Sequence, residues 1–89
     1  YSPNYFPAQI GKGIILTKLK RYPEASNEFQ QILLNTQLTE SQQAETWFYL
    51  GKTLCKSSRN LAARIAFKTA LKLKPDYEAA KQAQQSCDR

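Results

Sequence analysis

Histidine is absent from this chain of 89 residues, which removes the commonest general base and the commonest metal ligand of proteins. The seven acidic residues are scattered along the chain. Glu24 and Glu28 share one helix face, but on an amphipathic helix such a pair is typical of a solvated edge. The sequence therefore predicts a non-enzymatic protein with no catalytic residues, no bound metal and no cofactor.

Cysteine is scarce, with only Cys55 and Cys87 present. Two cysteines this far apart do not supply a disulfide framework or a zinc site. One bridge between them could form, but the sequence favours free thiols in a reducing compartment. A cytoplasmic location is therefore predicted.

Long apolar runs and alternating strand-like runs are both missing. The longest apolar stretches, such as 13–16 and 47–50, cover a few residues, whereas a transmembrane helix needs roughly 20. No basic, apolar and small-residue succession of a secretory signal is found at the start. Membrane insertion is not expected, and the hydrophobic content of 42% is ordinary for a folded chain.

Basic residues outnumber acidic ones by 13 to seven, and the excess lies in the second half. Residues 44–89 hold nine basic and four acidic residues, against four and three in residues 1–43. Arg64, Lys68 and Lys72 recur at i, i+4 and i+8 as a helical stripe, which we interpret as a solubilising surface. The alternative is a nucleic-acid-binding module that uses the basic C-terminal half.

Two apolar stripes at helical spacing dominate the second half of the chain. The first recurs at i, i+3, i+4 and i+7, the second at i, i+4 and i+7, and a polar break at residues 57–60 separates them. Small residues permit close approach of two antiparallel helices, and the rings fill the space between them. In chain order the residues are Trp47, Leu50, Gly51 and Leu54, then Ala63, Phe67 and Ala70, and finally Pro75.

This order resembles the tetratricopeptide repeat (TPR), W-x-x-L-G-x-x-Y, A-x-x-x-F and P, with Leu54 where the pattern usually has tyrosine. The resemblance implies an all-α fold, a TPR-like α-α superhelix in which antiparallel helix pairs form a right-handed stack. It also implies a protein–protein interaction scaffold that binds a partner peptide in a concave groove.

A degenerate first copy precedes this pattern. When the chain is aligned with itself so that Gly13 matches Gly51, Phe29 also matches Phe67. We call this alignment the Gly13–Gly51 frame. A second frame uses Ile10, Gly11 and Ile14 instead, and both frames stay open at this point.

The repeat period in the Gly13–Gly51 frame is longer than the usual period of about 34 residues. The excess fits a longer turn at 37–43. Within that turn, Thr39-x-x-Gln42 predicts a capping box that opens the next helix.

We expect one domain over residues 1–89, with repeat 1 at about 6–39, repeat 2 at about 44–77 and a capping helix at about 76–87 that has Asp76 as its N-cap. Because repeat arrays usually need about three units, the chain is expected to be part of a longer protein. Aromatic residues Tyr1, Tyr5 and Phe6 would then form an exposed end that permits self-association. The five helices are expected at about Pro7–Leu19, Pro23–Asn35, Glu40–Lys56, Asn60–Leu73 and Asp76–Ser86.

The resemblance also implies which residues line the groove. Aromatic platforms beside lysines suit a peptide with an apolar anchor and acidic or C-terminal carboxylate groups. For Phe48, packing against the neighbouring repeat is an equal alternative to groove exposure. A third hypothesis is a purely structural spacer in a larger assembly. The implied groove residues are Ile10, Ile14, Thr17 and Lys18 in the first copy, and Glu45, Phe48, Tyr49, Lys52, Cys55 and Lys56 in the second.

Overall fold

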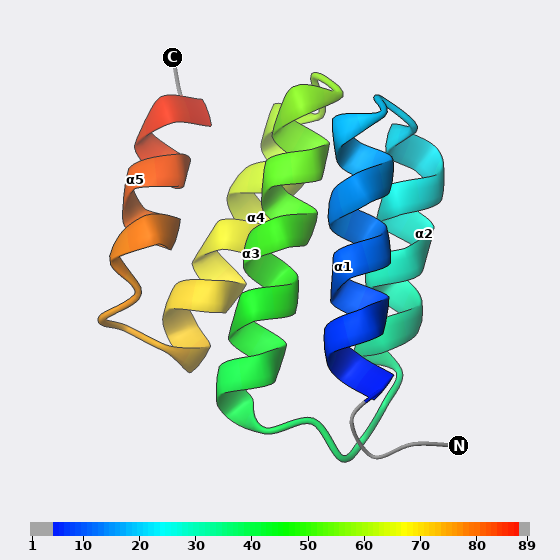
Figure 1. The fold of residues 1–89 in the computed structure, drawn as a ribbon. Helices are drawn as coiled ribbons and strands as arrows, with labels where there is room; N and C mark the ends of the chain where they lie inside the picture. Colours follow the sequence, from blue (N-terminus) through cyan, green and yellow to red (C-terminus); the bar gives the residue numbers. More distant parts are fainter. Residues whose placement is uncertain (1–4, 88–89) are drawn as a thin grey trace.

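The computed structural model describes residues 5–87, and this part of the chain is all-α, with five helices and no strand (Figure 1). The predicted fold class is confirmed at this level. The helix boundaries lie close to the predicted ones, within the usual uncertainty of such boundaries. The helices are α1 (Tyr5–Lys18), α2 (Tyr22–Leu33), α3 (Glu40–Lys56), α4 (Asn60–Leu73) and α5 (Glu78–Cys87).

The start of α3 is fixed by the predicted capping box. The Gln42 N–H donates to the Thr39 hydroxyl at 3.1 Å, and the Thr39 N–H donates to the Gln42 side-chain oxygen at 3.0 Å. These bonds satisfy N–H groups that a helix terminus otherwise leaves without a partner. At α5 the expectation was wrong, because the helix begins at Glu78 and the Tyr77 carbonyl accepts the N–H of Lys81, so Asp76 lies in the preceding turn.

Two glycines at equivalent positions of the repeat are packed against phenylalanine rings in the same way. A Cβ built on Gly13 would lie 2.5 Å from Cε1 of Phe29, and one on Gly51 would lie 2.7 Å from Cε1 of Phe67. Gly11, by contrast, has nothing within 4 Å of such an atom. The packing therefore follows the Gly13–Gly51 frame and not the frame that used Gly11.

The turns inside the two helical hairpins repeat as well. Lys20 and Ser58, which the Gly13–Gly51 frame also aligns, have positive φ angles of 64° and 66°. The residue after each donates its N–H at 2.9 Å to the carbonyl of Leu16 or Leu54, which is the long bond of a Schellman motif. The α1–α2 and α3–α4 hairpins are thus two copies of one local structure.

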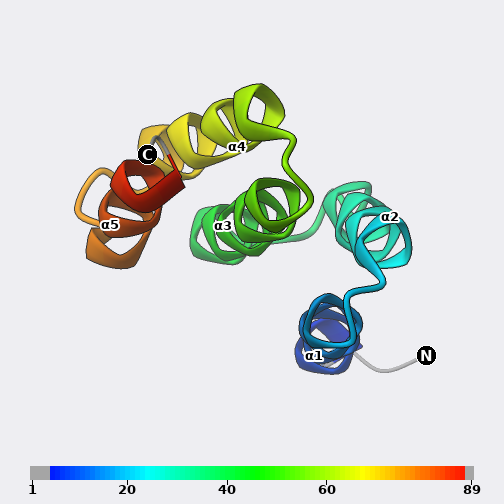
Figure 2. The same cartoon turned by 90° about the horizontal axis from the view of Figure 1, so that it is seen from above.

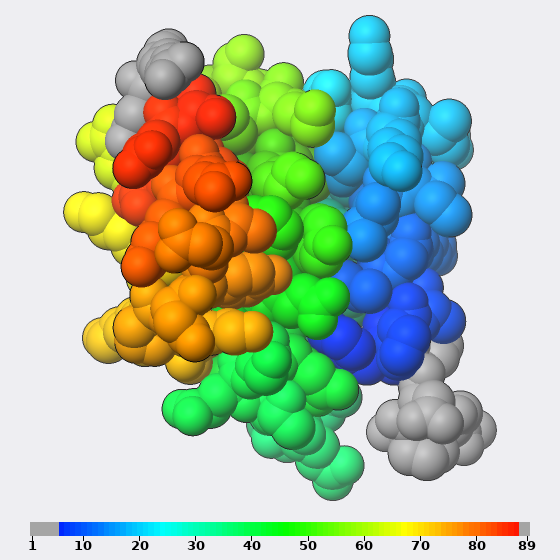
Figure 3. Space-filling model, turned by 60° about the vertical axis from the view of Figure 1, so that its left-hand side comes forward, coloured from blue at the N-terminus to red at the C-terminus, as the bar shows by residue number. Residues whose placement is uncertain are grey.

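Successive helices pack side by side and are staggered into two rows. Seen from above, α1, α3 and α5 border one side of the molecule and α2 and α4 the other (Figure 2). The hydroxyls of Thr17 and Thr53 lie 2.7 Å apart and join α1 to α3. In the space-filling view, the surface of α3 lies between α5 and α1 (Figure 3).

The core has two parts, one around the α1–α2 hairpin that also takes in Leu38 and Leu50, and one around the α3–α4 hairpin and α5. Phe29 and Phe67 are the largest fully buried side chains, each at the centre of its own group. Trp47 is half-buried and contacts both groups, so it also joins the two hairpins, which the pattern did not predict. The buried hydrophobic residues are Ile10, Ala25, Phe29, Ile32, Leu38 and Leu50 in the first group, and Phe48, Ala63, Phe67, Ala70, Ala80 and Cys87 in the second.

Cys55 and Cys87 form a disulfide, with their Cα atoms 5.9 Å apart. The expectation of free thiols was therefore wrong. Helix packing brings the ends of α3 and α5 together, and a sequence separation of 32 residues did not reveal this. Because disulfides are typical of oxidising surroundings, the observation on which the cytoplasmic prediction rested is removed.

Within residues 5–87, no helix has the length and apolar content required to cross a membrane.

Candidate functional site

Three aromatic rings meet between α3 and the start of α5, and we call Phe48, Tyr49 and Tyr77 the aromatic cluster. The ring centroids of Phe48 and Tyr49 are 5.0 Å apart in an edge-to-face arrangement, and those of Phe48 and Tyr77 are 5.1 Å apart. These separations are the ones that favourable aromatic pairs adopt. The cluster holds the turn before α5 against the middle of α3.

Two lysines lie over these rings. The Lys52 ammonium is 5.3 Å from the Phe48 centroid and 5.8 Å from that of Tyr49, and the Lys74 ammonium is 5.0 Å from the Tyr77 centroid. Cations within about 6 Å of a ring face are attracted by its negative face. The surface of the cluster is therefore both aromatic and positively charged.

Tyr77 has an altered acidity. Partial burial, together with the nearby Glu45 carboxylate and Tyr49, raises the pKa of Tyr77 to about 12. Burial disfavours the charged phenolate, and the Glu45 carboxylate disfavours a second negative charge beside it. The shift therefore extends the pH range in which the Tyr77 hydroxyl stays protonated and can donate a hydrogen bond.

The predicted groove residues fall into several groups. Tyr49, Glu45 and Lys52 lie together at the aromatic cluster, because Lys52 lies over the Tyr49 ring and Glu45 is near Tyr77. Tyr49 and Glu45 are half-buried and Lys52 is exposed. Phe48 is only 7% exposed, and Ile10 only 8%. Phe48 therefore follows the packing alternative, since it packs on Phe67 and Tyr77. The expected groove exposure of Ile10 is corrected, because Ile10 belongs to the first core group.

The other predicted groove residues lie in different parts of the fold. Ile14 is half-buried against the first core group, and Lys18 lies near the end of α1. Cys55 is half-buried in the disulfide, so it offers no free thiol to a partner. Lys56 borders a different surface, formed with α2 and the α3–α4 turn. The structure thus brings together only part of the predicted set.

Tyr77 and Lys74 belong to the site, although the sequence did not indicate them. Both lie in the connection between α4 and α5, which the repeat pattern assigned to the closing turn and cap. The available signal was the succession Lys74-Pro75-Asp76-Tyr77, where an aromatic residue follows a helix-ending proline.

The first helix also exposes apolar side chains. Tyr1 lies outside the described residues, and the structure describes no side chain for Tyr5. Phe6 is half-buried against the first core group. Ile15 and Leu19 are instead exposed apolar residues at α1 and its C-terminal turn, at 58% and 61%.

The described residues hold no group of three or more histidine, cysteine, aspartate or glutamate side chains placed to bind a metal ion.

Comparisons with protein-family models, with curated proteins and with solved structures find no match to this chain. The fold itself defines the class at the level of architecture: an all-α chain in which two similar helical hairpins are followed by a further helix. The resemblance to tetratricopeptide repeats therefore depends on the residues of this chain, and we treat it as a proposal.

Proposed function

We propose that this chain is a non-enzymatic, tetratricopeptide-type interaction scaffold that binds a partner peptide along the side formed by α1, α3 and α5. The repetition of the two hairpins, in glycine packing and in turn geometry, is the observation that supports a superhelical arrangement. Helical arrays of this kind present an extended concave surface because each unit is rotated slightly from the last.

The surface of the aromatic cluster suggests the chemistry of the peptide. Tyr49 and Tyr77 are only half-buried, while Lys52 lies over the ring of the buried Phe48. A peptide with one apolar anchor and neighbouring acidic side chains, or a C-terminal carboxylate, fits this combination. Glu45 disfavours a uniformly negative ligand in the vicinity of Tyr77.

Two alternatives make different predictions. A nucleic-acid-binding module would use the basic stripe of α4, where Arg64, Lys68 and Lys72 are placed, and its binding would fall steeply with salt. A structural spacer would have no peptide ligand. Self-association through the exposed residues Ile15 and Leu19 is compatible with both alternatives. Sedimentation over a concentration series tests whether the chain self-associates.

Compartment is a separate question. A cytoplasmic location stays a prediction, now without free thiols to support it. The redox state of Cys55 and Cys87 in protein isolated from its native source would test it, because a reducing compartment keeps such thiols reduced.

The test of the proposed function begins with selection from a displayed library of random short peptides against the oxidised protein. The affinity of the selected peptides is then measured for a double variant, Lys52→Glu with Lys74→Glu. We expect a loss of about tenfold or more, because two charge-assisted contacts change sign. Helical circular dichroism should show that the variant remains folded.

Lys68→Glu with Lys72→Glu is the matched control, because it makes the same change in net charge at two exposed positions of α4, outside the proposed binding side. This control should bind the selected peptides nearly as well as the original chain. An equal loss in both double variants would mean that binding is non-specific charge attraction and would overturn the proposal. Tight binding of single-stranded RNA that collapses with salt would favour the nucleic-acid alternative.

A further inference from the structure

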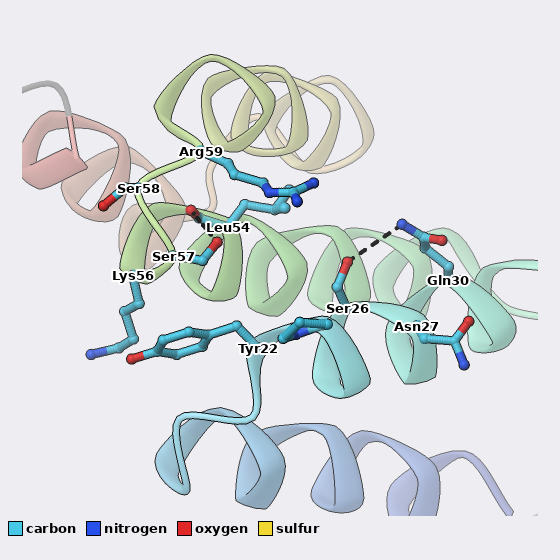
Figure 4. Close-up of a pocket in the computed structure, with 10 residues that line it drawn as sticks. Tyr22, Ser26, Asn27, Gln30, Leu54, Lys56, Ser57, Ser58 and Arg59 are labelled. Carbon is cyan, nitrogen blue, oxygen red and sulfur yellow. Dashed lines mark hydrogen bonds between the residues drawn. The ribbon is translucent and has the colours of Figure 1, made fainter.

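A depression of about 620 Å³ lies on the other side of the molecule, between α2 and the turn from α3 to α4 (Figure 4). None of its lining residues is fully buried, so it is a shallow, open site. Small-molecule pockets usually enclose most of their ligand, whereas an open depression suits a segment of a larger partner. The lining residues are Tyr22, Pro23, Ser26, Asn27, Gln30, Leu54, Lys56, Ser57, Ser58 and Arg59.

Positive charge and hydrogen-bond donors dominate this lining. Lys56 and Arg59 contribute two cations, and no acidic residue takes part. Figure 4 shows the Lys56 side chain extending from the end of α3 and the Arg59 side chain passing above Leu54. Tyr22, Ser26 and Ser58 add hydroxyl groups to the lining and Asn27 adds an amide, whereas the Ser57 hydroxyl already donates to the Leu54 carbonyl at 2.9 Å.

The internal repeat explains why Arg59 has no acidic partner in the described part of the chain. Its equivalent in the first hairpin is Arg21, which has nearly the same backbone angles and pairs with Glu24 at 3.1 Å, on the first turn of α2. In the second hairpin that position is Ala62, so the carboxylate is missing. The same local structure is neutralised in one copy and left positive in the other.

From this asymmetry we infer that the depression binds a phosphorylated side chain of a partner protein. A phosphate monoester carries close to two negative charges and three acceptor oxygens, which match two cations and the neighbouring hydroxyl donors. The guanidinium of Arg59 can meet two phosphate oxygens at once, a geometry that a lysine does not offer. Because both cations belong to exposed side chains, they can close on the ligand without a change in the helices.

This site is independent of the proposed peptide groove. The depression is lined from α2, the last turn of α3 and the α3–α4 turn, whereas the aromatic cluster lies at the middle of α3 and before α5. Lys52→Glu with Lys74→Glu should therefore leave phosphate binding unchanged, and failure of either proposal does not imply failure of the other.

Ala62→Glu provides the test, because it supplies the acidic partner that Arg21 already has. The position is exposed, and a carboxylate in the first turn of α4 is favourable for the helix, so the fold should be retained. Ala62→Gln is the matched control, since it has the same size without the charge. Lys56→Gln removes the second cation.

Affinities are measured with three peptide libraries that differ only in the central residue, which is phosphoserine, serine or glutamate. The original chain should bind the phosphoserine library at least about tenfold more tightly than either of the others. Ala62→Glu and Lys56→Gln should each lower that affinity about tenfold, and Ala62→Gln should leave it within about twofold. Backbone amide shifts should concentrate at residues 22–27 and 56–59.

Several results would overturn the inference. Equal affinities for Ala62→Glu and Ala62→Gln would show that Arg59 does not hold the ligand. Equal binding of the phosphoserine and serine libraries, or shifts centred elsewhere, would show that the depression is not a phosphate site. Inorganic phosphate that binds as tightly as the phosphopeptides would point to a small anion rather than a partner protein.

Discussion

Gly51 and Phe67 are packed so closely that a methyl group on residue 51 would overlap the ring, since its Cβ would lie 2.7 Å from Cε1 of Phe67. Gly13 and Phe29 repeat this relationship in the other hairpin. Both rings are almost fully buried, so neither can move aside without disturbing its core group. Close approach of the two helices in each hairpin therefore requires glycine at these positions.

Gly51→Ala and Gly13→Ala should each lower the free energy of unfolding by about 1 to 3 kcal/mol, because the added methyl forces the ring or the helix to move. Gly11→Ala is the matched control, with open space around the new methyl. It should raise stability by about 0.5 to 1 kcal/mol through better helix propensity. Urea unfolding measures all three, and similar values for Gly11 and Gly51 would contradict the close packing.

Lys20→Gly and Ser58→Gly should each raise stability by about 0.5 to 1 kcal/mol. Both residues have positive φ, which a side chain disfavours and glycine adopts freely. Thermal unfolding under identical conditions measures the gain. Lys20→Ala and Ser58→Ala are the controls and should give none, since alanine has the same steric conflict.

Reduction of the Cys55–Cys87 disulfide should lower the free energy of unfolding by about 3 to 4 kcal/mol. The bridge joins cysteines with a sequence separation of 32, and the chain-entropy relation for loops of that length gives this magnitude. Denaturation with and without reductant measures the difference. In the variant Cys55→Ser with Cys87→Ser, reductant should have no effect; a persisting effect would mean that it acts elsewhere.

Hydrogen exchange shows which part of the chain loses stability when the Cys55–Cys87 disulfide is reduced. Because the disulfide ties the C-terminal helix α5 to α3, the amides of α5 should lose protection first on reduction. Amides of α1 and α2 should change little. Uniform loss along the chain would show that α5 does not open separately.

The pH dependence of stability should carry a contribution from Tyr77. Its pKa is raised from 10.0 to about 12, so the folded state retains the proton longer than the unfolded state. Below pH 10 both states are protonated and the contribution is fully present. Between about pH 10 and 12 it should be lost, with a slope of at most about 1.4 kcal/mol per pH unit for one proton.

Tyr77→Phe removes this slope, so the measurement is the difference between the original chain and the variant across that pH window. Ultraviolet titration of tyrosine ionisation gives an independent reading, in which the group with the highest pKa should disappear in Tyr77→Phe. The same slope in both proteins would show that Tyr77 titrates normally.

Much of the architecture follows from local patterns. Apolar spacing placed all five helices close to their observed bounds, and Thr39 with Gln42 predicted the start of α3 correctly. The Gly13–Gly51 frame also aligns Phe29 with Phe67, but the sequence left the second frame open, and the packing of Gly13 and Gly51 decides between them. Such features depend on neighbours within a few turns of helix, and the sequence shows those neighbours directly.

The site was predicted less completely. Phe48 and Tyr49 are adjacent on one predicted helix face, yet one is nearly buried and the other half-buried. Phe48 is buried because it packs on Phe67 of α4 and on Tyr77, which follows the far end of α4 in the chain. The whole of α4 separates these two residues in sequence, and no periodicity connects them.

The sequence by itself determined the helices, their order and the repetition of the hairpins, because spacing, capping and glycine placement act over short distances. Only the tertiary structure decided the pairing of Cys55 with Cys87, the burial of Phe48, and the division of the lysines between two faces. These features depend on how the helices approach one another in space. That approach results from the simultaneous packing of many side chains that are distant in the chain.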